Sequence, residues 1–314
     1  MDQTLPQVRH RYWNTFMDSA RWNDFAVRAG DIIVCTPYKA GTTWTQMICG
    51  LLIFQDPKLP LPLAELSPWF DMRPHPLEEL LARYEAQGHR RFIKTHTPLD
   101  GLPYFKDATY LYCGRDPRDI FLSMQQHKAN QNIGHLLEMM HARGEELSPT
   151  PESPADLNEA FQLWMTKGSF EWEQDGYPFW SVFHHLETFW QFRHLPNVHF
   201  LHYADLSADL EGQMRSVATI LGIHVDEARW PALIKAATFE EMKRNADRTA
   251  PDTDLHIWRE NSRFFHSGTS GKWRAELSAA SLECYDRVSQ QREPAVMIEW
   301  LQQGGSVVGN PKNL

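Results

Sequence analysis

The sequence predicts a single α/β domain, spanning residues 1–314, built on a central parallel sheet with helices on both faces. Four short apolar runs, at residues 31–35, 90–98, 109–113 and 198–203, each pass through a polar loop into a stretch of helical composition. The chain of 314 residues can bury a full core without disulfides or metals, and its composition shows no boundary of a second domain.

Composition excludes several classes of protein. The chain has 42% hydrophobic and 23% charged residues, as in ordinary globular domains. Its net charge of -9 argues against a general binder of nucleic acid or anionic membranes, so any phosphate site must be a local basic pocket. No apolar run approaches the roughly 18 residues of a membrane span, and the N-terminus lacks a signal-peptide pattern. We therefore expect a cytoplasmic protein with no membrane partner.

The four cysteines are scattered along the chain without the spacing of metal ligands. They are Cys35, Cys49, Cys113 and Cys284. Three of them lie in apolar runs, which predicts buried, reduced thiols.

The first part of the chain alternates between irregular and regular segments. Residues 1–28 carry aromatic side chains without a clear period, which indicates an irregular lead-in packed on the domain. The first strand follows Gly30, and residues 44–54 continue as an apolar helix. Residues 56–76 contain six prolines, which forbid a regular element.

The later elements follow the same logic. Residues 77–88 have helix composition, and Asp116 and Pro117 are suited to cap and open a helix after the third strand. Residues 125–177 are polar and of low periodicity, so we expect a mobile loop there. A helical stretch at 205–221 ends at Gly222, and a short helix starts near residue 237 before a loop at 244–263.

The turn after the first strand has the chemistry of a phosphate site. It leaves backbone N–H groups unpaired at a helix N-terminus, and Lys39, Thr42 and Thr43 add a charge and two hydroxyl donors. It is not a Walker loop, because Lys39 precedes Gly41 and no earlier glycine is in register. The alternative is an ordinary turn with a surface lysine.

Charged and polar residues follow several of the predicted strands. In parallel sheets ligands bind outside the carboxyl ends of the strands, and Lys39, Lys94, His96, Arg115 and Tyr203 fall there. Two lysines and an arginine suit a ligand with several negative groups, and a histidine suits proton transfer. A lone histidine after a strand is often structural, but a lysine two residues away on the same face favours a functional one. The set indicates group transfer.

Five segments resemble those of the cytosolic-type sulfotransferases, in the same order and over most of residues 30–274. The segment 39–44 resembles the phosphosulfate loop Lys-Ser-Gly-Thr-Thr-Trp, although Pro37-Tyr38 inverts the usual Tyr-Pro and Ala40 replaces serine. Lys94-Thr95-His96-Thr97-Pro98 resembles Lys-Thr/Ser-His-Leu-Pro. The other matches are Arg115 with Ser123, the tyrosine of the segment 200–205, and the segment 238–243.

The resemblance implies the sulfotransferase fold and a metal-free enzyme that uses 3′-phosphoadenosine 5′-phosphosulfate (PAPS). The sulfuryl group would pass to a hydroxyl or amine of a small, aromatic or hydrophobic acceptor, such as a phenol, alcohol or amine. It also implies that His96 is the general base, that Lys39 and Lys94 stabilise developing charge, and that Ser123 restrains Lys39. The implied nucleotide-binding residues are Lys39, Ala40, Gly41, Thr42, Thr43, Trp44, Arg115, Ser123, Tyr203, Thr238, Phe239, Met242, His266, Ser267 and Gly268.

The chain departs from the family pattern near its C-terminal end. The family's Arg-Lys-Gly-x-x-Gly-Asp-Trp-Lys appears at residues 266–274 with His266-Ser267 in place of the basic pair. A fixed charge at the 3′-phosphate is lost, so we expect weaker or more pH-dependent nucleotide binding, with Arg263 as a candidate to compensate. Residues 274–283 only faintly echo the family's dimer segment, which leaves a monomer and a homodimer open.

Two other functions compete with the sulfotransferase interpretation. A kinase on a similar sheet would need a Walker loop and a metal-binding carboxylate, and the loop is absent. A non-catalytic or weakly active nucleotide-binding protein is favoured by His266-Ser267 but opposed by the retained Lys39, Lys94 and His96. The acceptor pocket is least defined, because its candidate aromatic residues are equally suited to the core. They are Trp69, Phe70, Phe179, Trp180, Phe183, Phe189 and Trp190.

Overall fold

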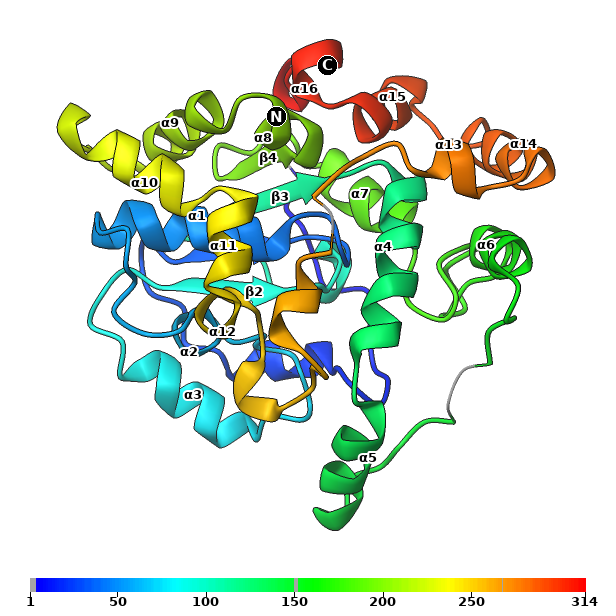
Figure 1. Ribbon diagram of the computed structural model, residues 1–314, viewed down its shortest axis with the longest axis horizontal. Helices are drawn as coiled ribbons and strands as arrows, with labels where there is room; N and C mark the ends of the chain where they lie inside the picture. Colours follow the sequence, from blue (N-terminus) through cyan, green and yellow to red (C-terminus); the bar gives the residue numbers. More distant parts are fainter. Residues whose placement is uncertain (1–3, 150–151, 267) are drawn as a thin grey trace.

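The computed structural model describes residues 4–149, 152–266 and 268–314, and its centre is a four-stranded parallel sheet. The strand order is β2-β1-β3-β4 (Figure 1). The strands are β1 (Ile32–Cys35), β2 (Phe92–Thr95), β3 (Thr109–Gly114) and β4 (Val198–His202). All three pairings are parallel, with Ile32 of β1 opposite Phe92 of β2 and Thr109 of β3. The predicted α/β class is confirmed.

The central strand shows why the sheet is covered on both faces. All four residues of β1 are fully buried, and successive side chains point to opposite faces of a strand. Ile33 and Cys35 belong to one hydrophobic cluster, whereas Ile32 and Val34 belong to the other. A continuous apolar run of this kind is typical of a parallel strand between two layers of helices.

Different helices cover the two faces (Figure 1). On one face α1 (Thr42–Phe54), α9 (Leu210–Leu221) and α10 (Trp230–Ala236) pack with Ile32 and Val34. On the other face α4 (Pro117–Asn130), α6 (Leu157–Thr166), α7 (Val182–Trp190), α14 (Ala279–Ser289) and α15 (Ala295–Gln303) pack with Ile33 and Cys35. The remaining α-helices are α2 (Leu63–Leu66), α3 (Leu77–Glu85), α5 (Ile133–Ala142), α8 (Tyr203–Ala208), α11 (Phe239–Arg244), α12 (Ala246–Thr249), α13 (Trp273–Glu276) and α16 (Gly305–Val308).

Short 3₁₀ helices join these elements. They are η1 (Ser19–Asp24), η2 (Leu99–Gly101), η3 (Glu227–Arg229), η4 (Thr253–Leu255), η5 (Asn261–Phe264) and η6 (Pro311–Asn313). Only η1 falls within the described part of the lead-in, residues 4–28, so that part is irregular as expected.

Helix ends follow the predicted chemistry. The Asp116 carboxylate accepts a hydrogen bond from the backbone N–H of Arg118, and Pro117 occupies the first turn of α4. Gly222 ends α9 with φ 64°, in the left-handed region that glycine adopts without strain. The predicted helix at 205–221 is two helices, because the chain breaks at Asp209, whose carboxylate caps Gly212.

The expectation of a loop over residues 125–177 is wrong where the structure has helices. In this segment α4 continues to Asn130, and α5 and α6 follow. In α5, Ile133, Leu136, Leu137 and Met140 recur at helical spacing, and Leu136 and Met140 are buried, so packing of this apolar face stabilises the helix. Smaller corrections are the single turn α2 in the proline-rich segment and α12 in the segment 244–263.

Two expectations, on the cysteines and on membrane spans, can be compared with the structure. All four cysteines are free and buried, as predicted. Among the described residues, no helix combines the length and the apolar character that crossing a membrane requires.

Candidate active site

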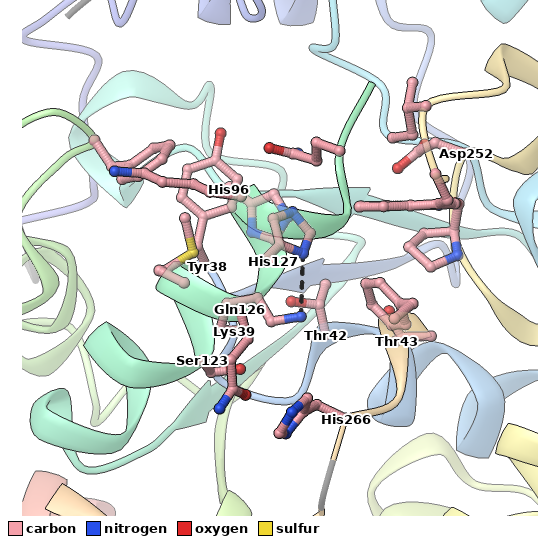
Figure 2. Close-up of a pocket in the computed structure, with 18 of the residues that line it drawn as sticks. Tyr38, Lys39, Thr42, Thr43, His96, Ser123, Gln126, His127, Asp252 and His266 are labelled. Atoms are coloured by element: carbon pink, nitrogen blue, oxygen red, sulfur yellow. Dashed lines mark hydrogen bonds between the residues drawn. The ribbon is translucent and has the colours of Figure 1, made fainter. Parts of the chain in front are cut away.

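A cavity of about 660 Å³ lies at the carboxyl ends of the strands. Its walls come from the β1–α1 loop, the end of β2, α4, α5 and the segment from Pro251 to Lys272. The structure brings to this one cavity all five residues that the sequence places at strand ends, namely Lys39, Lys94, His96, Arg115 and Tyr203. Figure 2 shows several of the lining side chains pointing into it.

The start of α1 offers a row of free backbone donors. Gly41 precedes the helix with φ 106° and contributes no side-chain cap. Within the described residues, no acceptor is bonded to the N–H groups of Gly41, Thr42, Thr43 or Trp44, and the first helical bond runs from Thr45 to the Gly41 carbonyl. Unpaired N–H groups and the positive end of the helix dipole make this turn a site for an anion.

Lys39 points into the cavity from a left-handed backbone conformation with φ 59°. Its Nζ lies 3.3 Å from Nδ1 of His127 and 4.2 Å from the centre of the Phe264 ring (Figure 2). Burial, with Arg115 and Lys94 nearby, lowers the pKa of Lys39 to about 7. The lysine that the phosphate loop contributes therefore changes charge near neutral pH.

The structure assigns the partner of Lys39 differently from the family resemblance. Ser123 lines the cavity, but its hydroxyl has no hydrogen bond to any residue that the structure describes. His127 follows Ser123 by four residues on α4, so both lie on the same face of the helix, and His127 contacts the lysine. Sequence reasoning missed His127, although this spacing from Ser123 was a usable signal.

His96 is oriented by one backbone hydrogen bond. Its Nδ1 lies 2.9 Å from the carbonyl oxygen of Thr36, and because a carbonyl only accepts, Nδ1 carries the proton. Nε2 is then the basic nitrogen, and the ring packs beside Tyr38 and Trp69 at centroid distances of 4.3 and 4.9 Å. Burial and the neighbouring Lys94 hold the pKa of His96 well below 6.5, so the imidazole is neutral at pH 7. A neutral, oriented imidazole is suited to act as a general base.

Lys94 is paired with an acid that the sequence did not indicate. Its Nζ donates to Oδ2 of Asp252 at 2.9 Å, and both side chains are 5% exposed. Asp252 lies in the loop between α12 and η4 and matches none of the predicted motifs.

Arg115 connects the phosphate loop to the C-terminal segment. Its guanidinium donates to the Lys39 carbonyl at 3.0 Å and to the Thr269 carbonyl at 3.4 Å, and it lies 4.1 Å from the centre of the Tyr203 ring. The Nε of Arg115 is buried and has no hydrogen-bond partner among the described residues. This unsatisfied donor next to the cavity fits an anionic ligand.

An aromatic wall faces the phosphate loop. Trp44 packs edge-on against Tyr203 and donates from Nε1 to the carbonyl of Ala237 at 2.8 Å. Gly268 has φ 64°, and a β-carbon there would lie 2.9 Å from the Phe239 ring, so a residue without a side chain fits this close approach. Phe239, Met242, His266 and Gly268 all line the cavity, as the sequence predicts.

Some predicted nucleotide-binding residues lie elsewhere. Thr238 is outside the cavity lining, because its hydroxyl donates to the Lys235 carbonyl and caps α11 at Glu241. The side chain of Ala40 is fully buried rather than part of the lining. Ser267 falls outside the described residues.

A lysine that the sequence analysis overlooked lies near His266. Lys272 lines the cavity, and burial together with Lys272 and Lys243 lowers the pKa of His266. Arg263, the expected compensating cation, also lines the cavity, but its Nε lies 2.7 Å from Glu260. Lys272 is thus a second candidate to replace the charge lost with the family's basic pair.

The far end of the cavity is largely apolar. Of the seven aromatic residues considered for an acceptor pocket, Trp69 and Phe179 line the cavity. The other five are not among its described lining residues and pack in the hydrophobic core. The lining includes further apolar residues that the sequence did not predict, among them Met72, Ile133, Leu136, Leu137, Ile257 and Trp258. Half of these come from α5, in the segment expected to be a loop.

Comparison with known proteins places the chain in a family. The model of the sulfotransferase domain matches residues 29–304, so the chain belongs to the sulfotransferase domain family. The predicted sulfotransferase, an enzyme of the transferase class, is thereby confirmed, and the kinase alternative is set aside.

Relatives of the chain carry sulfotransferase names. It is 39% identical over 311 residues to a glycolipid sulfotransferase of Mycobacterium bovis, covering 93% of this chain and 94% of the relative. It is 38% identical to a glycolipid sulfotransferase of Mycobacterium tuberculosis, with the same coverage. Human sulfotransferase 1C2 is 23% identical, over 88% of this chain and 87% of its own.

Solved structures confirm the fold. A mouse sulfotransferase complexed with PAP (adenosine 3′,5′-bisphosphate) superimposes with a TM-score of 0.65 at 19% identity, covering 90% of this chain and 92% of its own. A retinol dehydratase in complex with androsterone and inactive cofactor PAP gives 0.59 at 20% identity, covering 88% and 85%. The layered sheet described above is therefore the sulfotransferase fold.

Proposed function

We propose that this chain transfers the sulfuryl group of PAPS to a hydroxyl group of an apolar acceptor, with His96 as general base. The enzyme is a PAPS-dependent sulfotransferase. The acceptor and the roles of individual residues are the parts that we infer. The observation that carries the proposal is the tautomer of His96, since Nδ1 is fixed by the Thr36 carbonyl and Nε2 remains basic beside the cavity.

The donor end of the cavity fits a ligand with a phosphosulfate group and a second phosphate. The unpaired N–H groups at the start of α1, with Thr42 and Thr43, would hold the 5′-phosphosulfate. PAPS supplies the activated sulfuryl group, and no metal is needed for its in-line displacement. Trp44 and Phe239 would flank the adenine.

The second phosphate needs its own cations. Arg115 has a buried, unsatisfied Nε at the cavity, and Ser123 offers a free hydroxyl within the described structure. Lys272 would add the charge that His266 and Ser267 do not supply at neutral pH. Three donors of this kind support retained nucleotide binding and argue against a protein with a decayed site.

The chemical step follows from the positions of His96 and Lys39. Nε2 of His96 takes the proton of the acceptor hydroxyl while the acceptor oxygen bonds to sulfur and the bond from sulfur to the phosphate oxygen breaks. The Thr36 carbonyl stabilises the resulting imidazolium through Nδ1–H. Lys39, when protonated, places a positive charge where negative charge develops on the leaving oxygen.

The apolar end of the cavity indicates the class of acceptor. Its lining from Met72, Leu136 and Trp258 suits a molecule with a hydrocarbon body and one reactive hydroxyl. The relatives at 38–39% identity are named glycolipid sulfotransferases, so we place glycolipids first among such acceptors. Steroid-like alcohols come next.

We also propose that the enzyme works in the cytoplasm, where thiols stay reduced, because its four cysteines are free and buried. Monomer and homodimer both stay open.

Transfer from radiolabelled PAPS to a panel of glycolipids, steroid alcohols, phenols and amines tests the proposal, with the His96→Ala variant as a matched control. We expect labelled product from apolar alcohols with the wild-type enzyme and almost none with the variant. Product with phenols or amines alone would overturn the acceptor class, and equal product from both enzymes would overturn the role of His96.

A further inference from the structure

Asp252 is a buried acid in the wall of the cavity that no motif of the sequence explains. Its side chain is 5% exposed, and Oδ2 accepts a hydrogen bond from Lys94 Nζ at 2.9 Å. Figure 2 shows it on the side of the cavity opposite Tyr38. A buried acid beside a reactive centre needs a structural or a functional explanation.

The loop that carries Asp252 holds this residue in an unfavourable backbone conformation. Asp252 has φ 52°, in the left-handed region that non-glycine residues avoid. Its carboxylate caps no backbone N–H of the following η4 helix. The loop is anchored instead by Trp258, whose Nε1 donates to the Pro251 carbonyl at 2.6 Å. These features indicate that the loop holds the carboxylate against Lys94 rather than serving local capping.

A histidine supports the carboxylate from behind. His75 Nε2 lies 3.9 Å from Oδ1 of Asp252, and both atoms are buried without a hydrogen-bond partner in the described part of the chain. Burial alone would raise the pKa of Asp252, but Lys94 and His75 lower it far below its ordinary value. Asp252 is therefore a carboxylate anion, fixed between a lysine and a histidine.

Lys94 needs such a partner to be held in one position. Its ammonium sits on a flexible four-carbon stem, 5.3 Å from the centre of the Trp69 ring and two residues before His96 in the chain. An ammonium group in so buried a place is costly without a counter-ion. One N–H bonded to Asp252 leaves two further N–H donors for groups in the cavity.

We propose that Asp252, supported by His75, is a positioning residue that fixes the Lys94 ammonium beside the site of sulfuryl transfer. Because Lys94 is already held in one position, its contact with the reacting oxygens costs no further side-chain entropy during turnover. A preorganised group of this kind accelerates a reaction. The inference rests on the proposed function, since it assigns Lys94 to the transferring group.

Three single variants test it. Asp252→Asn removes the charge, Asp252→Glu keeps the charge but moves the carboxylate by one methylene, and Asp254→Asn is the matched control in the same loop. Asp254 pairs with Arg83 at 3.2 Å and is not part of the cavity lining. For each purified variant, we would measure kcat, the KM of both substrates, the Kd of PAP by calorimetry and the melting temperature.

We expect both Asp252 variants to lower kcat at least about tenfold and to change the Kd of PAP by less than about threefold. Asp254→Asn should match the wild type in kcat, in both KM values and in the Kd of PAP. If Asp252→Asn does not fold, Asp252→Glu decides the question, because the buried lysine keeps its counter-ion. A folded Asp252→Glu variant with a kcat within about twofold of the wild type would overturn the inference.

A double variant separates positioning from a general structural role. If Asp252 acts through Lys94, adding Asp252→Asn to Lys94→Met should lower kcat no further, whereas independent losses would multiply and contradict the inference. A wild-type enzyme that transfers sulfate to no acceptor would instead remove the proposed function, and this inference with it. The two failures are thus distinguishable.

Discussion

At the scale of single residues, the site depends on two groups whose charge burial suppresses. His96 is neutral at pH 7 because burial and Lys94 lower its pKa well below 6.5. Lys39 is half-protonated near pH 7 because burial, Arg115 and Lys94 lower its pKa to about 7. A neutral base and a cation whose charge changes near neutral pH are what the proposed proton abstraction and charge stabilisation require.

We expect His96→Ala to lower kcat by roughly 10²- to 10⁴-fold, the usual contribution of a general base, because His96 is the one histidine in the described lining of the cavity whose Nδ1 is held by a backbone carbonyl. The Kd of PAP, measured by calorimetry, should stay within about twofold of the wild type. Turnover near the wild-type level in the variant would refute the assignment of the base.

The pH dependence of turnover should report on Lys39. In the free enzyme its positive charge is lost as the pH rises through about 7, so kcat/KM for PAPS should fall above that pH. His96 stays neutral until well below pH 6.5, so the acidic decline should lie below that value. Lys39→Arg keeps the charge throughout and should abolish the alkaline decline, although at a lower rate. A wild-type profile that is flat between about pH 6 and pH 9 would contradict this role.

At the scale of elements, the sequence predicts the strands and the loops that follow them well. Ile32, Ile33 and Val34 form an unbroken apolar run, and a run of this kind has few alternatives to a buried parallel strand. Helix α5 was missed although Ile133, Leu136, Leu137 and Met140 recur at helical spacing, because the longer segment around them is polar and of low periodicity. This spacing was a usable signal for the helix, whereas the tertiary contacts that bury Leu136 and Met140 are not specified by it.

The same distinction applies to the site. Lys39, Lys94 and His96 could be predicted because Lys39 lies in the turn after β1 and the other two lie at the end of β2. Asp252 could not be predicted, since it reaches the cavity through a loop 158 residues from its partner Lys94 and follows no strand. The contact between Lys39 and His127 depends on where α4 lies against the phosphate loop, and the sequence does not specify that position.

Lys272, in the segment before α13, can be tested separately. Lys272→Ala should weaken PAP binding about tenfold, because one charge-assisted contact to the 3′-phosphate is lost. Binding of adenosine 5′-phosphosulfate, which has no 3′-phosphate, should not change. Lys58→Ala, at an exposed position, serves as the matched control. Equal losses for both nucleotides, measured by calorimetry, would place Lys272 elsewhere on the ligand.

A buried ion pair lies at the amino-terminal ends of β1 and β2. The guanidinium of Arg91 lies 2.5 Å from Asp31, and both side chains are 2% exposed. Asp31→Asn should lower the free energy of unfolding by about 3 kcal/mol, because Arg91 keeps its charge but loses its counter-ion. Asp254→Asn, which breaks a half-exposed pair with Arg83, should cost less than about 1 kcal/mol. Similar values for the two variants in urea unfolding would contradict the argument.

At the scale of the whole molecule, an acidic protein places several of its cations around one cavity. The net charge is -9, yet Lys39, Lys94, Arg115 and Lys272 line one cavity although they are far apart in the sequence. The fold brings Lys39, Lys94 and Arg115 together because the strands that they follow or end are parallel and finish at the same edge of the sheet, and the segment before α13 adds Lys272. Family membership identifies the reaction, and α5 and residues 251–258 contribute lining to the cavity in which we propose that the acceptor binds.

The most direct test of the account is a crystal structure of the enzyme with PAP. We predict that the 5′-phosphate accepts hydrogen bonds from the backbone N–H groups of Thr42 and Thr43, with Nε2 of His96 facing the place of the sulfuryl group. A nucleotide bound away from the start of α1, or an imidazole turned so that Nε2 points out of the cavity, would contradict the central claim.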